Sequence, residues 1–410
     1  MINNWSARPL GEVITVNPVV KLAKGETYPF VDIDKIETQN KSVTNVERRI
    51  FSGQSASRFQ TGDTLFSRIT PCLENRKIAQ AQLDGGAMGF GSTEFFVFRH
   101  KGGVTDPRFV YYLVSSDAVV LPAINSMTGA SGRQRADRKF VERIKLKLPP
   151  LPTQTRIAEV LSAYDDAIEN NNRRIALLEK AARELYKEWF VRMRFPGHKN
   201  ATFTNGIPAG WEVIRFGELV EIIDGDRGAN YPKQDEFSYE GYCLFLNAGN
   251  VTKSGFNFDN IVFITKEKDG ILRKGKLVRN DIVFTTRGTV GNVSFYSNYV
   301  SFDAIRINSG MVILRCSGCV SPEFIYTALK DESIQMMIRL YSSGSAQPQL
   351  PIKDMKKMKI MKPTDDLLEH FTAITSDMLN NVALLQSNTQ NLAKQRDLLL
   401  PRLMNGTLEV

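Results

Sequence analysis

The sequence predicts an α+β protein made of two pseudo-symmetric lobes, separated by two long antiparallel coiled-coil helices. The same ordered set of signals occurs twice, about 207 residues apart. Each copy ends in a long segment whose apolar residues are spaced four and three apart, which is typical of a helix that packs on another helix. Before that segment, each copy mixes short strand-like runs with turn residues and one or two short helices, so each lobe is predicted to be α+β.

The internal repeat begins with a tryptophan in each copy. Trp5 precedes Pro-Leu-Gly-Glu-Val, and Trp211 precedes Phe-Gly-Glu-Leu-Val. A Gly-Asp or Asn-Asp turn then leads into an apolar strand, at 62–67 and again at 280–285, and a proline-led helix follows in both copies. This duplication predicts internal two-fold pseudo-symmetry, and two similar but non-identical surfaces suit two similar but non-identical targets.

Prolines mark the boundaries between lobes and helices. Pro149, Pro150 and Pro152 stop any upstream helix and permit a start near Thr153, and Pro196 followed by glycine ends that helix. The expected segments are a first lobe at 1–152, a first helix at 153–195, a second lobe at 196–362 that starts with a linker at 196–210, and a second helix at 363–410.

Each long helix carries a heptad seam, which is the row of positions that a partner helix would cover. A strict 3.5-residue period favours a partner helix over a flat domain surface, so we expect the two helices to pack together. The second seam is weaker because Thr375, Thr389 and Arg396 occupy seam positions, and Asn171 either sets the register or is an ordinary polar site. The predicted seam residues are Ile157, Leu161, Tyr164, Ile168, Ile175, Leu178, Leu185, Leu368, Phe371, Met378, Val382, Leu385 and Leu392.

Composition places the chain among globular proteins that do not span a membrane. Of its 410 residues, 42% are hydrophobic and 10% are aromatic, which is enough for full cores. No apolar run approaches the roughly 18–20 residues of a membrane span, and the first residues lack the apolar region of a signal peptide. Four scattered cysteines are too few for a disulfide framework. We therefore expect a cytoplasmic protein.

The positive charge is concentrated in the two lobes. The net charge is +9, with 21 basic and 14 acidic residues in 1–150 and 21 basic and 17 acidic residues in 196–362. Positive lobes joined by near-neutral helices fit two nucleic-acid-binding heads on a protein-facing scaffold. A basic chain is also common among proteins that never touch DNA, so charge alone does not decide the function.

The sequence contains no recognisable motif for catalysis or cofactor binding. The run from Gly270 to Leu277 is similar to a phosphate-binding loop, but Leu277 stands where magnesium requires Ser or Thr, and a strand follows where a helix is needed. The pair Cys316 and Cys319 lacks the second ligand pair of a structural zinc site, and the three histidines form no ligand pattern. We predict a non-catalytic chain that binds no metal or cofactor itself.

Loops in both lobes are rich in side chains that read base edges and phosphates. For any single residue a solvated turn is the simpler explanation, but the repetition of such loops in both lobes favours DNA contact for each loop as a group. The candidate DNA-binding residues of the first lobe are Arg68, Thr70, Asn75, Arg76, Lys77, Ser92, Thr93, Ser131, Arg133, Gln134 and Arg135. Those of the second lobe are Asn247, Asn250, Thr285, Thr286, Arg287, Asn308, Ser309, Ser345, Gln347 and Gln349.

Three motifs occur in a fixed order. They are Trp-x-x-x-x-Leu-Gly-Glu-Val at 5–13, Gly-Asp-x-Leu-Phe-Ser-Arg at 62–68, and Thr-Gly-Ala-Ser at 128–131 followed by Lys-Leu-Lys-Leu-Pro-Pro-Leu-Pro at 145–152. In this order, and with the duplication, the chain resembles the DNA specificity subunit of type I restriction-modification systems over essentially its whole length.

The resemblance implies a function and a set of partners. It implies two target recognition domains, each of which reads one half of a bipartite, asymmetric site in double-stranded DNA, and two helices that set the spacer. It implies that the chain is not an enzyme but docks methyltransferase subunits, two of them expected, which use S-adenosylmethionine to methylate adenine. Restriction subunits that translocate DNA would join through the complex, so ATP and Mg are also expected on partner subunits.

Two other functions stay open on the residues alone. In one, the chain is part of a fused methyltransferase or nuclease, and the missing catalytic motifs, including any Asn-Pro-Pro-aromatic or Asp-Pro-Pro-aromatic tetrapeptide, argue against it. In the other, the chain is a coiled-coil adaptor whose lobes bind protein, and the concentration of positive charge in the lobes argues against it.

Overall fold

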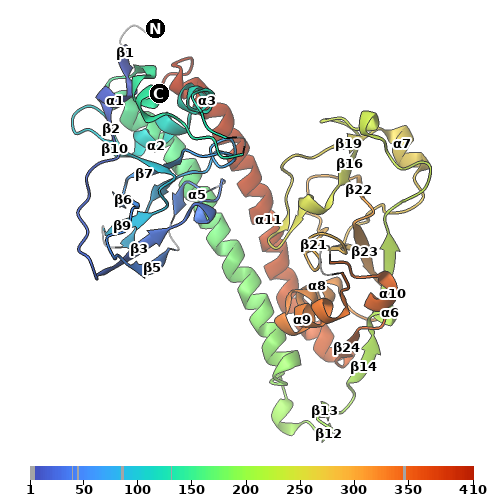
Figure 1. Ribbon diagram of the computed structural model, residues 1–410. Coiled ribbons are helices and arrows are strands. Elements are labelled where there is room, and N and C mark those ends of the chain that lie inside the picture. The colour runs from blue at the N-terminus through green and yellow to red at the C-terminus, as the bar shows by residue number, and fades with distance from the viewer. Residues whose placement is uncertain (1–4, 39, 44–45, 85–86, 131, 345–347) are drawn as a thin grey trace. The chain divides into compact units, whose positions relative to one another are not determined.

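The computed structural model describes residues 5–410 apart from 39, 44–45, 85–86, 131 and 345–347. The chain divides into two compact units, one formed by residues 1–170 and 389–410 and the other by residues 171–388. Both divisions fall inside the long helices, so each unit contains one lobe and a section of each helix (Figure 1).

The first lobe contains a five-stranded and a four-stranded sheet. Its strands are β1 (Ser6–Pro9), β2 (Ile14–Val16), β3 (Thr27–Val31), β4 (Ser42–Val43), β5 (Glu47–Ile50), β6 (Ser57–Gln60), β7 (Thr64–Ser67), β8 (Ile78–Ala81), β9 (Met88–Gly91), β10 (Phe95–His100) and β11 (Lys145–Leu148). The sheet orders are β2-β10-β7-β8-β4 and β5-β3-β9-β6, with β3 parallel to β9 and β4 parallel to β8. A separate antiparallel pair of β1 and β11 holds the entry of the lobe beside its exit.

Short helices complete the first lobe. They are α1 (Leu10–Val13), the 3₁₀ helix η1 (Ile33–Lys35), α2 (Pro107–Ser115), α3 (Asp117–Asn125) and α4 (Arg138–Arg143). Helix α2 begins at a proline, and the Asp106 carboxylate accepts hydrogen bonds from the N–H groups of Arg108 and Phe109 at 2.9 and 3.1 Å. Its buried face shares one core with Phe66 and Phe98 of the larger sheet.

The second lobe is built from more sheets than the first lobe, and each of them has two to four strands. Its strands are β12 (Phe203–Thr204), β13 (Ile207–Pro208), β14 (Glu212–Arg215), β15 (Val220–Asp224), β16 (Cys243–Leu246), β17 (Val251–Thr252), β18 (Gly255–Phe256), β19 (Phe263–Ile264), β20 (Ile282–Thr285), β21 (Val293–Phe295), β22 (Ile305–Ile307), β23 (Met311–Cys316) and β24 (Lys359–Lys362). Its main sheets have the orders β15-β23-β20-β21 and β19-β16-β22. The predicted linker at 196–210 contains the β12–β13 hairpin.

Short helices again connect these strands. They are η4 (His198–Asn200), α6 (Phe216–Leu219), η5 (Gln234–Glu236), η6 (Ala248–Asn250), α7 (Lys266–Ile271), α8 (Pro322–Lys330), α9 (Glu332–Tyr341) and α10 (Ile352–Met355). Helix α8 also begins at a proline, and the Ser321 hydroxyl caps it by accepting the N–H of Phe324 at 3.1 Å. The start of α8 therefore repeats that of α2.

The central strands of the two lobes have the same connectivity, which confirms the predicted internal repeat. The order β2-β10-β7-β8 matches β15-β23-β20-β21, and the parallel pair β3 and β9 matches β16 and β22. The interval between the copies is not constant. Ser6 pairs with Leu148 and Glu212 with Lys362, so the interval grows from 206 at the entry strand to 214 at the exit strand. In the long helices the interval is 214, one heptad longer than the predicted 207. The sequence pattern did not reveal the difference, because a seven-residue shift leaves the phase of the seam unchanged.

An ion pair between a buried carboxylate and a partly exposed arginine occurs at the same place in each lobe. Asp63 is 1% exposed and accepts two hydrogen bonds of 2.6 Å from the Arg99 guanidinium. Asp281 is also 1% exposed and accepts hydrogen bonds of 2.9 and 2.8 Å from Arg315. Each carboxylate also accepts the N–H three residues before it. The pair joins the turn before β7 or β20 to β10 or β23, and removing one partner would leave a buried charge without compensation.

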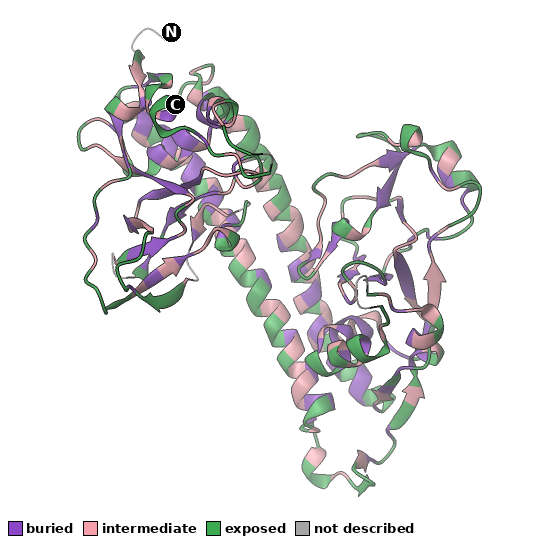
Figure 2. Ribbon diagram, in the orientation of Figure 1, coloured by how far each residue is buried: buried purple, intermediate pink, exposed green. Residues whose placement is uncertain are grey.

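The long helices pack antiparallel in each unit. They are α5 (Leu151–Tyr186), which continues as the π-helix η3 (Lys187–Val191), and α11 (Asp365–Met404). In the first unit, Ile157 of α5 and Leu403 of α11 belong to one core. In the second unit, Ile175 of α5 clusters with Val382 of α11. Within each unit the lobe also contributes to a core with the helices, as the distribution of buried residues in Figure 2 indicates.

All of the predicted seam residues are at least partly covered. Ile157, Leu161, Ile168, Ile175, Leu368, Phe371, Val382 and Leu385 are buried, and Tyr164, Leu178, Leu185, Met378 and Leu392 are half-buried. Helix α5 begins at Leu151 rather than near Thr153, because Pro152 falls in the first turn, where a missing N–H costs nothing.

Replacement of Asp63 by Ala is expected to destabilise the first lobe by about 2–3 kcal/mol, because Arg99 keeps its charge and loses its acceptor. Hydrogen exchange of the β7 and β10 amides measures the change, and the second lobe should exchange as before. Asp34→Ala is the matched control, since the Asp34 side chain is 70% exposed. Equal exchange in the two variants would show that the buried pair does not stabilise the lobe.

Candidate nucleic-acid interface

In the first lobe, three of the predicted loops are joined by backbone hydrogen bonds where β7 ends and β10 begins. The N–H of Arg68 donates to the carbonyl of Glu94 at 2.9 Å, and the N–H of Ala136 donates to the carbonyl of Arg68 at 2.8 Å. The N–H of Thr70 donates to the carbonyl of Gln134 at 3.0 Å. We call residues 68–70, 92–94, 128–130 and 132–136 the first loop cluster.

The second lobe builds the same frame from different residues. The N–H of Thr286 donates to the carbonyl of Gly310 at 2.9 Å, and the N–H of Leu350 donates to the carbonyl of Thr286 at 3.0 Å. Arg287 and Gln349 form an isolated β-bridge, as Ile69 and Arg135 do in the first lobe. We call residues 285–289, 308–310, 343–344 and 348–350 the second loop cluster. By this register Arg135 corresponds to Gln349, and Glu94 corresponds to Gly310.

These clusters collect most of the candidate DNA-binding residues. The first cluster contains Arg68, Thr70, Ser92, Thr93, Arg133, Gln134 and Arg135, and the second contains Thr285, Thr286, Arg287, Asn308, Ser309 and Gln349. Three further candidates, Ser131, Ser345 and Gln347, lie outside the described residues.

Glu94 pairs with two of the three arginines in the first cluster. Its carboxylate accepts hydrogen bonds from Arg135 at 2.7 and 2.9 Å, and it also pairs with Arg68 at 3.3 Å. The hydrogen bonds from Arg135 hold the pKa of Glu94 below its usual range, although partial burial opposes the shift. Arg133 is exposed, and among the described residues no acid pairs with it. Arg68 and Arg135 are therefore paired with Glu94, whereas Arg133 has no acidic partner among the described residues.

The second cluster has one exposed cation on a frame of buried hydroxyls. Thr285 and Thr286 are buried, and their hydroxyls donate to the carbonyls of Thr289 and Gly310. These threonines hold the loop in place. Arg287 is exposed, and no acid within the described part of the chain pairs with it. Because glycine stands in the place of Glu94, this cluster lacks the acidic clamp of the first.

Three first-lobe candidates lie outside the cluster. Arg76 pairs with Asp117 and donates to the carbonyl of Ser115 at 3.2 Å. Lys77 donates to the carbonyl of Ile33 at 3.0 Å, and Asn75 lies exposed in the turn before it. Arg76 and Lys77 therefore both bind acceptors within the chain.

Two second-lobe candidates support the backbone. The Asn250 side chain is buried and donates to the carbonyls of Asn257 and Asp259 at 3.1 and 3.3 Å. Its oxygen accepts the N–H of Asn247, whose own side chain caps η6. Asn250 therefore has no free group to offer to a base.

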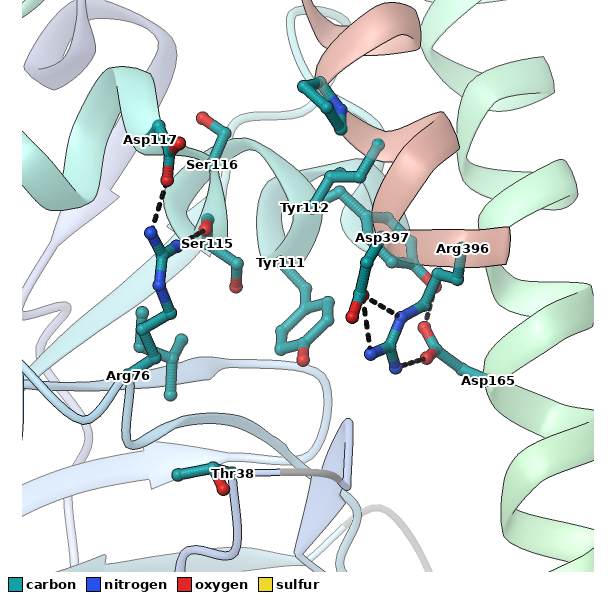
Figure 3. Close-up of a pocket in the computed structure, with 13 residues that line it drawn as sticks. Thr38, Arg76, Tyr111, Tyr112, Ser115, Ser116, Asp117, Asp165, Arg396 and Asp397 are labelled. Carbon is teal, nitrogen blue, oxygen red and sulfur yellow. Dashed lines mark hydrogen bonds and ion pairs between the residues drawn. The ribbon is translucent and has the colours of Figure 1, made fainter. Parts of the chain in front are cut away.

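The first unit also contains a cavity of about 370 Å³ that the sequence did not predict. Arg396 of α11 reaches Asp165 of α5 at 2.6 Å on its wall, and the Tyr112 hydroxyl donates to the same carboxylate at 2.5 Å (Figure 3). Burial and the neighbouring Asp165 charge raise the pKa of Tyr112 far above its ordinary value. Both carboxylate oxygens are occupied, so Asp165 links the lobe to the two long helices. Arg396 at a seam position was the one sequence signal for it.

Lys276 and Cys316, which belong to the run similar to a phosphate loop and to the Cys-x-x-Cys pair, have defined surroundings in the structure. Within the described ranges, no three His, Cys, Asp or Glu side chains are placed to hold a metal ion. Lys276, the lysine of the run similar to a phosphate loop, is bound to Asp269 at 2.5 Å. Burial raises the pKa of the Cys316 thiol to about 12. No helix in the part of the chain that the structure describes is long and apolar enough to cross a membrane.

Comparison with known proteins decides the family. The family model described as the type I restriction modification DNA specificity domain matches residues 2–180 and again 208–388. The chain belongs to this family. The two matches confirm the resemblance predicted from the sequence and the duplication of the domain. The family consists of specificity components, which supports the prediction that the chain is not itself an enzyme.

Relatives of this family extend over most of the chain. The type I restriction enzyme MjaIX specificity subunit of Methanocaldococcus jannaschii is 27% identical over 76% of this chain and 71% of its own. The HindI specificity subunit of Haemophilus influenzae is 23% identical over 87% of this chain and 88% of its own. A crystal structure of a type I restriction-modification S subunit from M. genitalium shares the fold, with a TM-score of 0.57, 16% identity, and 98% and 96% of the two chains covered.

Glu94→Gln is expected to increase non-specific DNA affinity, because it removes one negative charge and frees the guanidiniums of Arg68 and Arg135. Each new phosphate contact steepens the slope of log K against log salt by about 0.9, so a steepening of about one to two is expected. Fluorescence anisotropy with labelled duplex DNA over a salt series measures both. Glu74→Gln removes the same charge from an exposed site and should change the slope far less. Identical slopes in both variants would contradict a role for Glu94 as a clamp.

Proposed function

We propose that the chain is the DNA-reading subunit of a type I restriction-modification complex, and that each loop cluster reads one half of a bipartite site. The observation that carries the proposal is a shared backbone frame with different side chains at equivalent positions. Arg135 and Gln349 occupy corresponding bridge positions, and Arg favours guanine or phosphate, whereas Gln favours adenine. The same frame can therefore present two different reading surfaces.

The proposed partners follow from the repeat and the family. A surface that occurs once per repeat suits two copies of one partner, and we assign these partners as methyltransferase subunits that carry S-adenosylmethionine. Restriction subunits with ATP and Mg would join the same complex. A DNA target places the working complex in the cytoplasm. An adaptor with protein-binding lobes accounts less well for exposed arginines on both clusters.

The two lobes are expected to act as separate readers. Arg133→Ala with Arg135→Ala should weaken or relax recognition of one half-site, and Gln349→Ala should do so at the other half-site, by about 1–3 kcal/mol where a base contact is lost. Methylation of a plasmid library by the chain with its methyltransferase, followed by mapping of the modified adenines, measures both half-sites at once.

The matched control for these variants is Lys21→Ala, which removes an exposed cation outside both clusters. It should leave both half-site preferences intact. If variants of one cluster relax recognition of both half-sites, the two clusters do not read independently. If the variants have no effect, other residues make the DNA contacts.

The helices are expected to set the spacer between the half-sites. Deleting 166–172 from α5 and 388–394 from α11 removes one heptad from each and leaves the Asp165–Arg396 pair and the Ile175–Val382 contact in place. Seven residues at 1.5 Å each shorten the helical segment by roughly 10 Å, or about three base pairs. The same library assay should therefore return unchanged half-sites with a shorter spacer.

A deletion that breaks the heptad phase is the control. Removing 168–171 and 389–392 takes four residues from each helix and rotates the remaining seam away from its partner. That variant should lose activity or stability, whereas the heptad deletion should keep both. An active heptad deletion with the original spacer would show that the lobes set the distance.

A further inference from the structure

The first unit contains a buried ion pair between the two long helices. The side chains of Asp165 and Arg396 are 4% and 17% exposed, and their atoms approach to 2.6 Å. Tyr112 of the lobe donates to the second carboxylate oxygen, so one acid links α2, α5 and α11 (Figure 3). Burial alone would lower the pKa of Arg396, but the Asp165 charge raises it above the ordinary value.

The second unit contains a different buried ion pair, between a long helix and the lobe. Lys330 at the end of α8 reaches Glu179 of α5 at 2.6 Å, and the two side chains are 10% and 12% exposed. The Lys330 ammonium also lies 4.8 Å from the centre of the Tyr326 ring. Each unit thus has its own charged contact between a long helix and another element.

Neither pair is repeated at the equivalent positions of the other unit. The interval of 214 in the long helices makes Leu379 the counterpart of Asp165 and Ala182 the counterpart of Arg396, and both counterparts are buried. The same interval makes Ala393 the counterpart of Glu179. Helices α2 and α8 begin at Pro107 and Pro322, which makes Ser115 the counterpart of Lys330. Every charged member therefore corresponds to an apolar or small neutral residue.

This asymmetry penalises pairing between like helices of two copies. If α5 paired with α5 of a second copy, Ala182 would stand where Arg396 stands, and the buried Asp165 would lose its ion-pair partner. If α11 paired with α11, Leu379 would stand where Asp165 stands, and Arg396 would lose its buried acid and keep only Asp397, an exposed acid of its own helix. A buried charge that loses its partner is strongly destabilising, whereas a buried pair adds little over an apolar pair. The Asp165–Arg396 pair therefore contributes more to the choice of helix partner than to the stability of the folded chain.

We propose that Asp165–Arg396 and Glu179–Lys330 make the two repeats non-interchangeable. Asp165–Arg396 restricts α5 to pairing with α11, and Glu179–Lys330 fixes α8, and with it the second lobe, on α5. The chain thereby excludes assembly with a second copy through matching helices, an assembly that its internal repeat would otherwise permit. This inference is independent of DNA recognition.

The test replaces the helix pair by the residues of the other repeat. The full chain with Asp165→Leu and Arg396→Ala is co-expressed in two differently tagged forms, and mixed-tag dimers are quantified by tandem purification and native mass spectrometry. The double variant should keep its thermal midpoint within a few degrees of the natural chain and form about tenfold or more mixed-tag dimer, since the discrimination is removed and the packing is kept.

Two further variants keep the test decisive. Arg396→Lys retains the charge and should form no more mixed-tag dimer than the natural chain. If the double variant fails to fold, the near-isosteric pair Asp165→Asn with Arg396→Gln removes both charges with less change in packing, and it should also increase the mixed-tag dimer. A folded, uncharged variant with no more mixed-tag dimer than the natural chain would overturn the proposal.

Discussion

The antiparallel contact of α5 with α11 is the interaction on which the rest of the structure depends. In the first unit, Phe109 of the lobe, Ile157 of α5 and Leu403 of α11 belong to one core. In the second unit, Phe324, Trp189 and Phe371 do the same. Each lobe thus buries its proline-led helix against both long helices at once. A lobe cannot complete its core until the two long helices, which lie far apart in the sequence, have met, so folding of the lobe and closure of the helix pair are one process.

The two loop clusters share one backbone frame and differ in their side chains. The Asp63–Arg99 and Asp281–Arg315 pairs fix the same strands in each lobe, and the backbone hydrogen bonds of the loop clusters repeat. What differs is chemistry. Glu94 holds Arg135 in one cluster, while glycine leaves the other cluster without an acid. Under the proposed function, a shared frame means that the two clusters differ in recognition through side chains such as these.

Much of this architecture could be predicted from the sequence, and the physical reason is periodicity. Heptad spacing identified which face of each long helix is covered, and repeated turn motifs identified the two lobes. The individual contacts could not be predicted in the same way. Glu94 meets Arg135, 41 residues later, only because the loop after β7 joins both of their loops: Arg68 bonds to the Glu94 backbone, and Ile69 forms a β-bridge with Arg135. Arg76 and Lys77 look like phosphate contacts in the sequence, yet a cation cannot reveal whether its acceptor belongs to DNA or to the same chain.

The register of the helix pair shows most clearly where periodicity stops being informative. A heptad pattern looks the same after a shift of seven residues, so the spacing of apolar residues cannot distinguish an interval of 207 from one of 214. The Asp165–Arg396 contact removes this ambiguity. A shift of one heptad along α5 would place Arg396 opposite Ala158 or Asn172 and leave Asp165 buried without its cation. Arg396 looks like a weakness in the second seam when hydrophobicity alone is considered. In the folded unit the same residue selects one register among several that the apolar residues would accept.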